Sequence, residues 1–173
     1  MIARALLLAG LSTVLAAPAV TPLTAGPSSA PASQCRPGEK IVYTCGFGKS
    51  VGSICANGGK LHYRYGPLSK PAIDIASDAR WSNVRRGFIV GGGGGSQRHL
   101  RFPRGDHSYV VFWGIGGQYT QVPGKTWSGI HVREGKTDLA TLRCKRAASP
   151  SDDWEDLAYD APEEDDPQFA MWF

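Results

Sequence analysis

The 173-residue sequence lacks closely spaced cysteines and a long apolar run beyond its first twenty residues, and it has few acidic residues before residue 150. Its cysteines fall at Cys35, Cys45, Cys55 and Cys144, with no C-x-x-C pair to build a zinc or redox motif. We therefore expect neither a metal nor a cofactor. No run after residue 20 is long enough to cross a bilayer, so no transmembrane segment is predicted.

The first twenty residues, MIARALLLAGLSTVLAAPAV, have the composition of an export signal. Arg4 supplies a short basic start, an apolar run follows, and small residues suited to signal peptidase lie around positions 16–19. We predict a signal peptide at 1–19, and therefore a protein that is exported to the periplasm or secreted. Residues 20–34 are rich in Pro, Ser and Ala and are predicted to form a flexible linker.

An even number of cysteines in an exported chain predicts disulfide bonds. The sequence leaves three pairings open. Cys45 and Cys55 fall symmetrically about Ser50, so a hairpin turning at 49–51 would bring them face to face. On that ground we predict a Cys45–Cys55 bond and a Cys35–Cys144 bond, the second of which would tie the ends of the domain together.

Charge is separated along the chain. Residues 35–147 hold 18 of the 19 Lys and Arg residues but only six of the 15 acids, a formal net charge of +12. The nine remaining acids follow residue 150, where Lys and Arg are absent. We predict a basic domain at 35–147 and an acidic tail at 148–173. The tail is either solvated and disordered, or held on the basic domain or a partner by aromatic anchors such as Trp154, Trp172 and Phe173.

Between residues 40 and 142, β-rich runs alternate with turn residues, and no helix-length periodicity is present. This pattern predicts an all-β domain, a single antiparallel sandwich or barrel of roughly 8–10 short strands stapled by disulfides. The expected strands cover residues 41–47, 50–55, 61–65, 72–75, 87–90, 99–102, 108–114, 118–122, 129–133 and 137–144. The glycine run at 91–95 is predicted to be a mobile loop between strands.

The sequence offers little to support catalysis. The histidines are scattered and form no H-x-x-x-H motif, G-x-S-x-G is absent, and the cysteines are expected in disulfides. Among the candidate acids for a catalytic carboxylate pair, Asp106 and Glu134 fall in expected turns. We therefore predict that the protein is not an enzyme.

Three blocks of the sequence resemble a family of small, exported, largely uncharacterised bacterial β domains. The first is Gly48-Lys49-x-Val51-x-Ser53-x-Cys55, followed by Leu61-x-Tyr63-Arg64-Tyr65-Gly66. The second is Phe102-x-x-Gly105-x-x-Ser108-Tyr109-x-Val111, and the third is Gly129-Ile130-x-Val132-x-x-Gly135-Lys136 with Leu142-x-Cys144. The resemblance implies an all-β fold and an exported location, and it implies no activity.

A looser likeness is to the periplasmic lysozyme inhibitors, small exported β domains that use a loop with a Ser-Gly and a downstream Tyr. The corresponding loop is Arg104-Gly105-Asp106-His107-Ser108-Tyr109, which lacks the Ser before Gly. Lysozymes are usually basic, so a domain of charge +12 would be repelled by them unless the acidic tail made the contact.

The sequence therefore favours a non-catalytic, exported binding module for an anionic envelope component or an envelope protein. The residues expected to bind are Arg98, Arg101 and Arg104 near the glycine loop, with Tyr63, Tyr65, Trp113 and Trp127 as aromatic surface. Two alternatives stay open: an inhibitor of a periplasmic or secreted hydrolase, acting through residues 104–109 or the tail, and an uncharacterised structural protein of the envelope. Nucleic acid would suit the charge, but export and the lack of a known module disfavour it.

Overall fold

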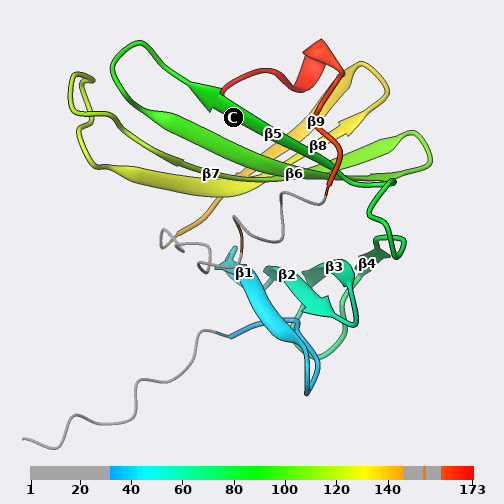
Figure 1. Ribbon diagram of the computed structural model, residues 1–173. Helices are drawn as coiled ribbons and strands as arrows, with labels where there is room; N and C mark the ends of the chain where they lie inside the picture. Colours follow the sequence, from blue (N-terminus) through cyan, green and yellow to red (C-terminus); the bar gives the residue numbers. More distant parts are fainter. Residues whose placement is uncertain (1–31, 146–153, 155–160) are drawn as a thin grey trace, which may run out of the picture. The chain divides into compact units, whose positions relative to one another are not determined.

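The computed structural model describes residues 32–145, 154 and 161–173 of the chain (Figure 1). The predicted signal peptide, most of the predicted linker and the stretch 146–160 apart from Trp154 lie outside the described residues. The elements below all fall within the unit Pro31–Phe173. No helix in the described part of the chain has the length and apolarity that a membrane crossing requires.

Among the described residues, nine β-strands form two antiparallel sheets, in which each strand pairs with the next one along the chain. The four-stranded sheet contains β1 (Lys40–Gly46), β2 (Val51–Asn57), β3 (Lys60–Gly66) and β4 (Ile73–Ala76). The five-stranded sheet contains β5 (Arg85–Val90), β6 (Ser96–Arg104), β7 (His107–Ile115), β8 (Thr126–Glu134) and β9 (Thr137–Arg143). The all-β fold is confirmed, and of the two predicted forms, sandwich or barrel, it is the sandwich-like one rather than a closed barrel.

Nine of the ten predicted strands are present, with ends that differ by a few residues. The exception is 118–122, which belongs to the loop between β7 and β8. The main chain of this loop bonds elsewhere, because Tyr119 N donates to Gly93 O and Thr120 N donates to Gly117 O. The Tyr119 side chain is 82% exposed, so no burial favours a strand here. The glycine run 91–95 is, as predicted, a loop, and it joins β5 to β6.

The core lies between the two sheets, since alternate residues of the long strands turn inward. It combines side chains of both sheets, among them Tyr43, Ile54, Tyr63, Leu100, Phe102, Val111 and Ile130. The Tyr63 ring stacks on Phe102 with 5.5 Å between the ring centroids. Trp154 also belongs to this core, with its ring 5.8 Å from that of Tyr43, so this predicted tail anchor is buried.

All four cysteines form disulfides, as predicted, but the predicted pairing is wrong. Cys35 bonds Cys55, and Cys45 bonds Cys144. The β1–β2 hairpin turns through 47–50, which places Cys45 opposite Gly52 rather than Cys55. Because successive side chains of a strand alternate between faces, Cys45 points into the core and Cys55 points to the opposite face of the sheet. Cys45 therefore links the two sheets through Cys144, which follows β9.

The segment before β1 covers the outward face of the four-stranded sheet. Gln34, predicted to end the flexible linker, is instead buried: its N–H donates to Ser53 Oγ and its side-chain amide donates to the oxygens of Gly66 and Pro67. The Cys35–Cys55 bond fastens this segment to β2. The ordered domain thus begins before residue 35.

Residues 161–173, here called the docked segment, wrap from the core around β5 and onto the five-stranded sheet (Figure 1). Ala161 lies in the core. Arg86 N then donates to Pro162 O (2.9 Å) and Glu164 N donates to Arg86 O (2.7 Å), so this stretch pairs in parallel with the β5 edge. A 3-10 turn, Pro167–Phe169, follows. Of the two interpretations of the tail, these residues fit the one in which it is held on the basic domain.

Candidate functional site

The docked segment covers the outer face of the five-stranded sheet, the face turned away from the four-stranded sheet. Directly paired residues of neighbouring antiparallel strands point to the same side, so the strand register assigns this face row by row. Its side chains include Gln97, His99, Arg101, Val110, Phe112, Trp127, His131, Arg133 and Arg143. The outer face therefore combines arginines with aromatic rings.

Glycines in the neighbouring strands let three of these rings lie flat on the sheet. A Cβ at Gly87 would lie 2.0 Å from the His99 ring, and one at Gly129 would lie 2.7 Å from the Phe112 ring. A Cβ at Gly114 would lie 2.4 Å from the Trp127 indole. His99 and Phe112 are paired opposite each other, yet His99 leans toward β5 and Phe112 leans toward β8. The glycines thus leave room for a flat aromatic layer of His99, Phe112 and Trp127, here called the aromatic floor, and a side chain at any of the three glycines would clash with it.

Phe173 is seated on this floor. Its ring centroid lies 5.5 Å from that of Phe112, 5.4 Å from that of His99 and 5.0 Å from that of His131. Phe173, a predicted anchor, is 7% exposed. Trp172, the other predicted anchor, packs at 5.9 Å against Trp127 but stays 42% exposed. Phe173 is therefore the stronger of these two anchors.

Phe169 is a further buried ring of the docked segment, at 3% exposure. The Arg101 guanidinium lies 4.4 Å from its ring centroid and that of Arg133 lies 5.4 Å away, both within cation–π range. Phe169 shares a small apolar cluster with Val110, Phe112 and Phe173. The outer face thus has a hydrophobic core of its own, separate from the one between the sheets.

The Glu164 carboxylate is the most buried acid of the docked segment, with a side chain 5% exposed. Arg101 binds both of its oxygens, through Nε at 2.6 Å and Nη2 at 2.7 Å. His99 Nε2 lies 3.8 Å from one of them, an ion-pair distance rather than a hydrogen bond. Burial by itself would raise the pKa of Glu164, but His99 and Arg101 outweigh it and lower the pKa to about 2. This site stabilises a carboxylate in its charged form.

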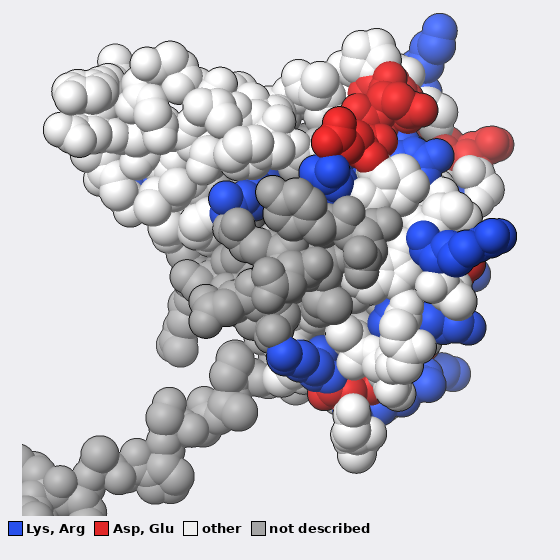
Figure 2. Space-filling model, viewed as in Figure 1, with Lys and Arg blue, Asp and Glu red and all other residues white. Residues whose placement is uncertain are grey.

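The neighbouring acids of the docked segment remain at the surface. Glu163 pairs with Arg86 at 2.8 Å and Asp165 lies 3.8 Å from Arg85, but the two carboxyl side chains are 79% and 82% exposed. Such exposed pairs contribute little stability. Figure 2 shows acidic side chains gathered beside basic ones on the face in view. The exposed acids therefore attract the docked segment to the basic domain, whereas the buried Glu164 fixes where the segment lies on it.

Polar side chains of the outer face also bind the main chain of the docked segment. Gln97, which is fully buried, donates from its amide nitrogen to Met171 O (3.1 Å) and accepts from Phe173 N (3.0 Å). Its amide oxygen also accepts from Trp127 Nε1 (3.2 Å), which fixes the orientation of the amide group. Arg133 donates to Gln168 O (3.0 Å) and Arg143 donates to Phe173 O (2.8 Å).

His131 lies below these contacts and is held in place from β9. Its Nδ1 lies 2.8 Å from Thr141 Oγ1 and its Nε2 lies 3.1 Å from an Asp138 oxygen. Burial lowers the pKa of His131, although Asp138 opposes that shift. Because both ring nitrogens contact polar partners, the His131 ring is held in a fixed orientation against Phe173.

The structure does not bring the predicted binding residues together. Arg101 and Trp127 lie on the outer face. Arg98 and Trp113 face each other on the opposite, inward side of the same sheet. Arg104 is exposed at the end of β6, beside the turn to β7.

The prediction that Tyr63 forms part of an aromatic surface is wrong. Tyr63 is 1% exposed, because its position in β3 turns its ring into the core. Tyr65, two residues further along the same strand face, is partly buried and packs on Phe47 with 5.8 Å between the rings. Neither side chain lies on the outer face.

The sequence analysis missed five side chains of the outer face, namely Gln97, His99, His131, Arg133 and Arg143. It also missed Glu164 of the docked segment. A signal was present in the alternation Gln97-x-His99-x-Arg101 and in His131-x-Arg133, because polar residues at every second position mark one face of a strand. That signal indicates a polar face. It does not indicate that Glu164, 63 residues beyond Arg101, occupies it.

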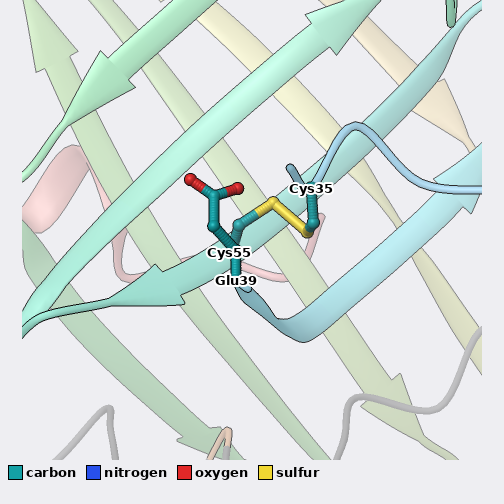
Figure 3. A group of neighbouring side chains, drawn as sticks. All are labelled: Cys35, Glu39 and Cys55. Atoms are coloured by element: carbon teal, nitrogen blue, oxygen red, sulfur yellow. A yellow bond between two sulfur atoms is a disulfide. The ribbon is translucent and has the colours of Figure 1, made fainter. Parts of the chain in front are cut away.

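A group of potential metal-ligand atoms, separate from the outer face, lies on the four-stranded sheet at Cys35, Glu39 and Cys55 (Figure 3). Their sulfurs are bonded to each other, so neither is a thiolate that could bind a metal. The carboxylate of Glu39 is bound by Arg64, which is fully buried and also donates to Asp74 (3.0 Å). Arg64 lowers the pKa of Glu39 to about 2. This group holds the segment before β1 on the sheet, through the disulfide to β2 and through the Glu39–Arg64 pair to β3.

Comparisons with known proteins found no family model, no curated protein and no solved structure that matches the chain.

Proposed function

We propose that the protein is an exported, non-catalytic binding module that uses the outer face of its five-stranded sheet to bind an anionic partner of the cell envelope, polymer or protein. The observation that carries the proposal is the buried Glu164 carboxylate, whose two oxygens both accept hydrogen bonds from Arg101. A carboxylate loses its hydration on burial, and charge-assisted hydrogen bonds must replace it. An external anion that reached Arg101 would receive the same charge-assisted hydrogen bonds in place of its hydration.

Two further features support this proposal. Both disulfides are of the kind that forms in an oxidising compartment outside the cytoplasm, which agrees with the export signal expected at 1–19. The net charge of +12 over residues 35–147 would also raise the rate of encounter with an anionic partner.

A hydrolase inhibitor is the weaker candidate. An acidic tail could reach a basic lysozyme only through acids that remain at the surface, but Glu164 is buried against Arg101. An inhibitor acting through 104–109 would place its basic turn against a basic enzyme. We therefore do not extend the proposal to inhibition.

The proposal is tested by releasing the docked segment and measuring retention on heparin, an anionic matrix, in a salt gradient. Replacing Phe169 and Phe173 by Ser in the full chain removes both buried rings, so the segment should leave the outer face. The double variant should elute at higher salt than the wild type, because Arg101 and Arg133 become accessible. Adding Arg101→Gln and Arg133→Gln to the double variant should return its elution to the salt concentration at which the wild type elutes.

The matched control is Phe88→Ser, which removes an aromatic ring that is 55% exposed and belongs to the inward side of β5. This variant should elute with the wild type. Equal retention of the wild type and the double variant would contradict the proposal.

A further inference from the structure

We infer that the ligand of the outer face is an extended peptide segment of a partner protein, and that the docked segment is the internal occupant that such a ligand must displace. The inference rests on the proposed function and specifies its ligand class. It follows from the contacts of the outer face, which binds the main chain and two aromatic rings of the docked segment as well as its charge.

The first step concerns main-chain recognition. The docked segment exchanges main-chain hydrogen bonds with the β5 edge at Pro162 and Glu164, in the manner of a strand added to a sheet. Farther along, Gln97 binds the main chain at Met171 and Phe173. Peptide groups supply all of these donors and acceptors, whereas a polysaccharide or a phospholipid headgroup has no comparable repeat.

The second step concerns the side chains that are read. Three side chains of the docked segment are nearly fully buried on the outer face: Glu164 against Arg101, Phe169 against Arg101 and Arg133, and Phe173 on Phe112. Their order is Glu-x4-Phe-x3-Phe. A ligand that met only the basic charge would leave both ring sites empty. The face is therefore built for one carboxylate followed by two aromatic rings.

The third step concerns competition. A segment attached to its own domain binds intramolecularly, with an effective concentration that can reach the millimolar range. An external peptide of the same sequence should therefore bind the wild-type protein poorly. Weakening the internal segment should uncover the site without changing any residue of the sheet.

The test uses a fluorescently labelled synthetic peptide with the sequence of residues 161–173, titrated against full-length protein and followed by fluorescence anisotropy. The Phe169→Ser and Phe173→Ser double variant should bind this peptide at least tenfold more tightly than the wild type does. The single variant Glu164→Gln keeps both rings and should show an intermediate affinity. If the double variant does not fold, as judged by the lack of a cooperative unfolding transition, Glu164→Gln still provides a protein whose docked segment is weakened.

Two altered peptides separate recognition from simple attraction. A scrambled peptide of the same composition should bind at least tenfold more weakly than the native order. A peptide N-methylated at the position of Glu164 should also lose affinity, because the methyl group removes the N–H that donates to Arg86 O. N-methylation at the preceding position, Glu163, is the matched control, since in a parallel bridge the N–H of that residue points away from β5.

The outcomes distinguish the inference from the proposed function. Equal binding of the native and scrambled peptides would overturn the inference, because charge alone would then explain the affinity. Tight retention of the double variant on heparin without peptide binding would also overturn it, while leaving an anionic polymer as the ligand and the proposed function intact. Failure to bind either probe would remove both.

Discussion

At the scale of single residues, Gly129 shows how the sheet makes room for a ring. A Cβ at this position would lie 2.1 Å from the main-chain oxygen of Leu142 and 2.7 Å from the Phe112 ring. We therefore expect Gly129→Ala to displace β9 or Phe112 and to destabilise the protein by about 1–3 kcal/mol, as overpacked substitutions do. Urea unfolding would measure the loss, and Trp fluorescence would report any loosening of the docked segment.

Gly46→Ala is the matched control for that substitution. Gly46 is also a strand glycine, but a Cβ there would meet no atom within 4 Å. Its substitution should change the free energy of unfolding by less than about 1 kcal/mol. Equal stability of the two variants would contradict the role given to Gly129.

Residue identities predicted part of the candidate site. Arg101 and Trp127 were found because basic and aromatic residues suit an anionic ligand, and both lie on the outer face. Tyr63 was misplaced because an aromatic residue in a strand suits core and surface equally, and only the register decides which side it faces. The roles of Gly87, Gly114 and Gly129 depend on cross-strand neighbours that no local pattern names.

At the scale of elements, the two disulfides should differ in their contribution to stability. The Cys45–Cys144 bond spans 99 residues and the Cys35–Cys55 bond spans 20. In the chain-entropy model these loops correspond to about 4.7 and about 3.3 kcal/mol. Replacing Cys45 and Cys144 by Ser should therefore destabilise the protein by about 1.4 kcal/mol more than replacing Cys35 and Cys55.

Denaturant unfolding of the two double variants would measure this difference, after non-reducing peptide mapping of the wild type has checked the pairing. The map should contain Cys35–Cys55 and Cys45–Cys144 peptides. A Cys45–Cys55 peptide would overturn the β1–β2 register described above. A larger loss from the shorter link would show that local contacts of Cys35 outweigh chain entropy.

The elements themselves were largely predictable. Alternating runs between turn residues identified nine strands, because a strand with one buried face repeats every two residues. The hairpin at 47–50 was misjudged because its turn length sets which residues share a face, and a symmetric spacing of Cys45 and Cys55 does not. The order of strands in each sheet follows the chain, which the sequence pattern alone does not reveal.

At the scale of the whole molecule, the buried carboxylates should make stability depend on acid. The pKa of Glu39 falls from 4.5 to about 2 on folding, chiefly through its hydrogen bond with Arg64. The pKa of Glu164 also falls to about 2. Because the folded values lie below the unfolded ones, the stability they supply is present above about pH 4.5 and is lost as the pH falls toward 2. The lowered pKa of His131 acts in the same direction below pH 6.5.

Glu39→Gln provides the test. At pH 7 this variant should be less stable than the wild type by about 3 kcal/mol, the free energy that corresponds to the pKa change. The gap should narrow as the pH is lowered, because the wild-type carboxyl then becomes neutral as well. Unfolding by urea at several pH values would follow it, with Glu134→Gln as a control since that side chain is 55% exposed. A gap that is independent of pH would contradict the assignment.

Whole-molecule properties of the sequence predicted the partnership between the tail and the domain only in outline. The separation of charge left docking as one of two interpretations, since opposite charges attract over long distances. It gave no hint that Pro162 and Glu164 pair with an edge strand, because such contacts depend on where the chain passes β5.

The strand-like pairing of the docked segment with β5 also bears on solubility. Without that cover, β5 would present unpaired main-chain groups at the sheet edge, beside Phe88 and Val90, which are 55% and 62% exposed. Exposed edges of this composition are templates for aggregation. A partner that removed the docked segment without supplying a strand of its own would leave a protein that is prone to aggregate through β5. Displacement of the segment and protection of the β5 edge therefore have to occur in a single event.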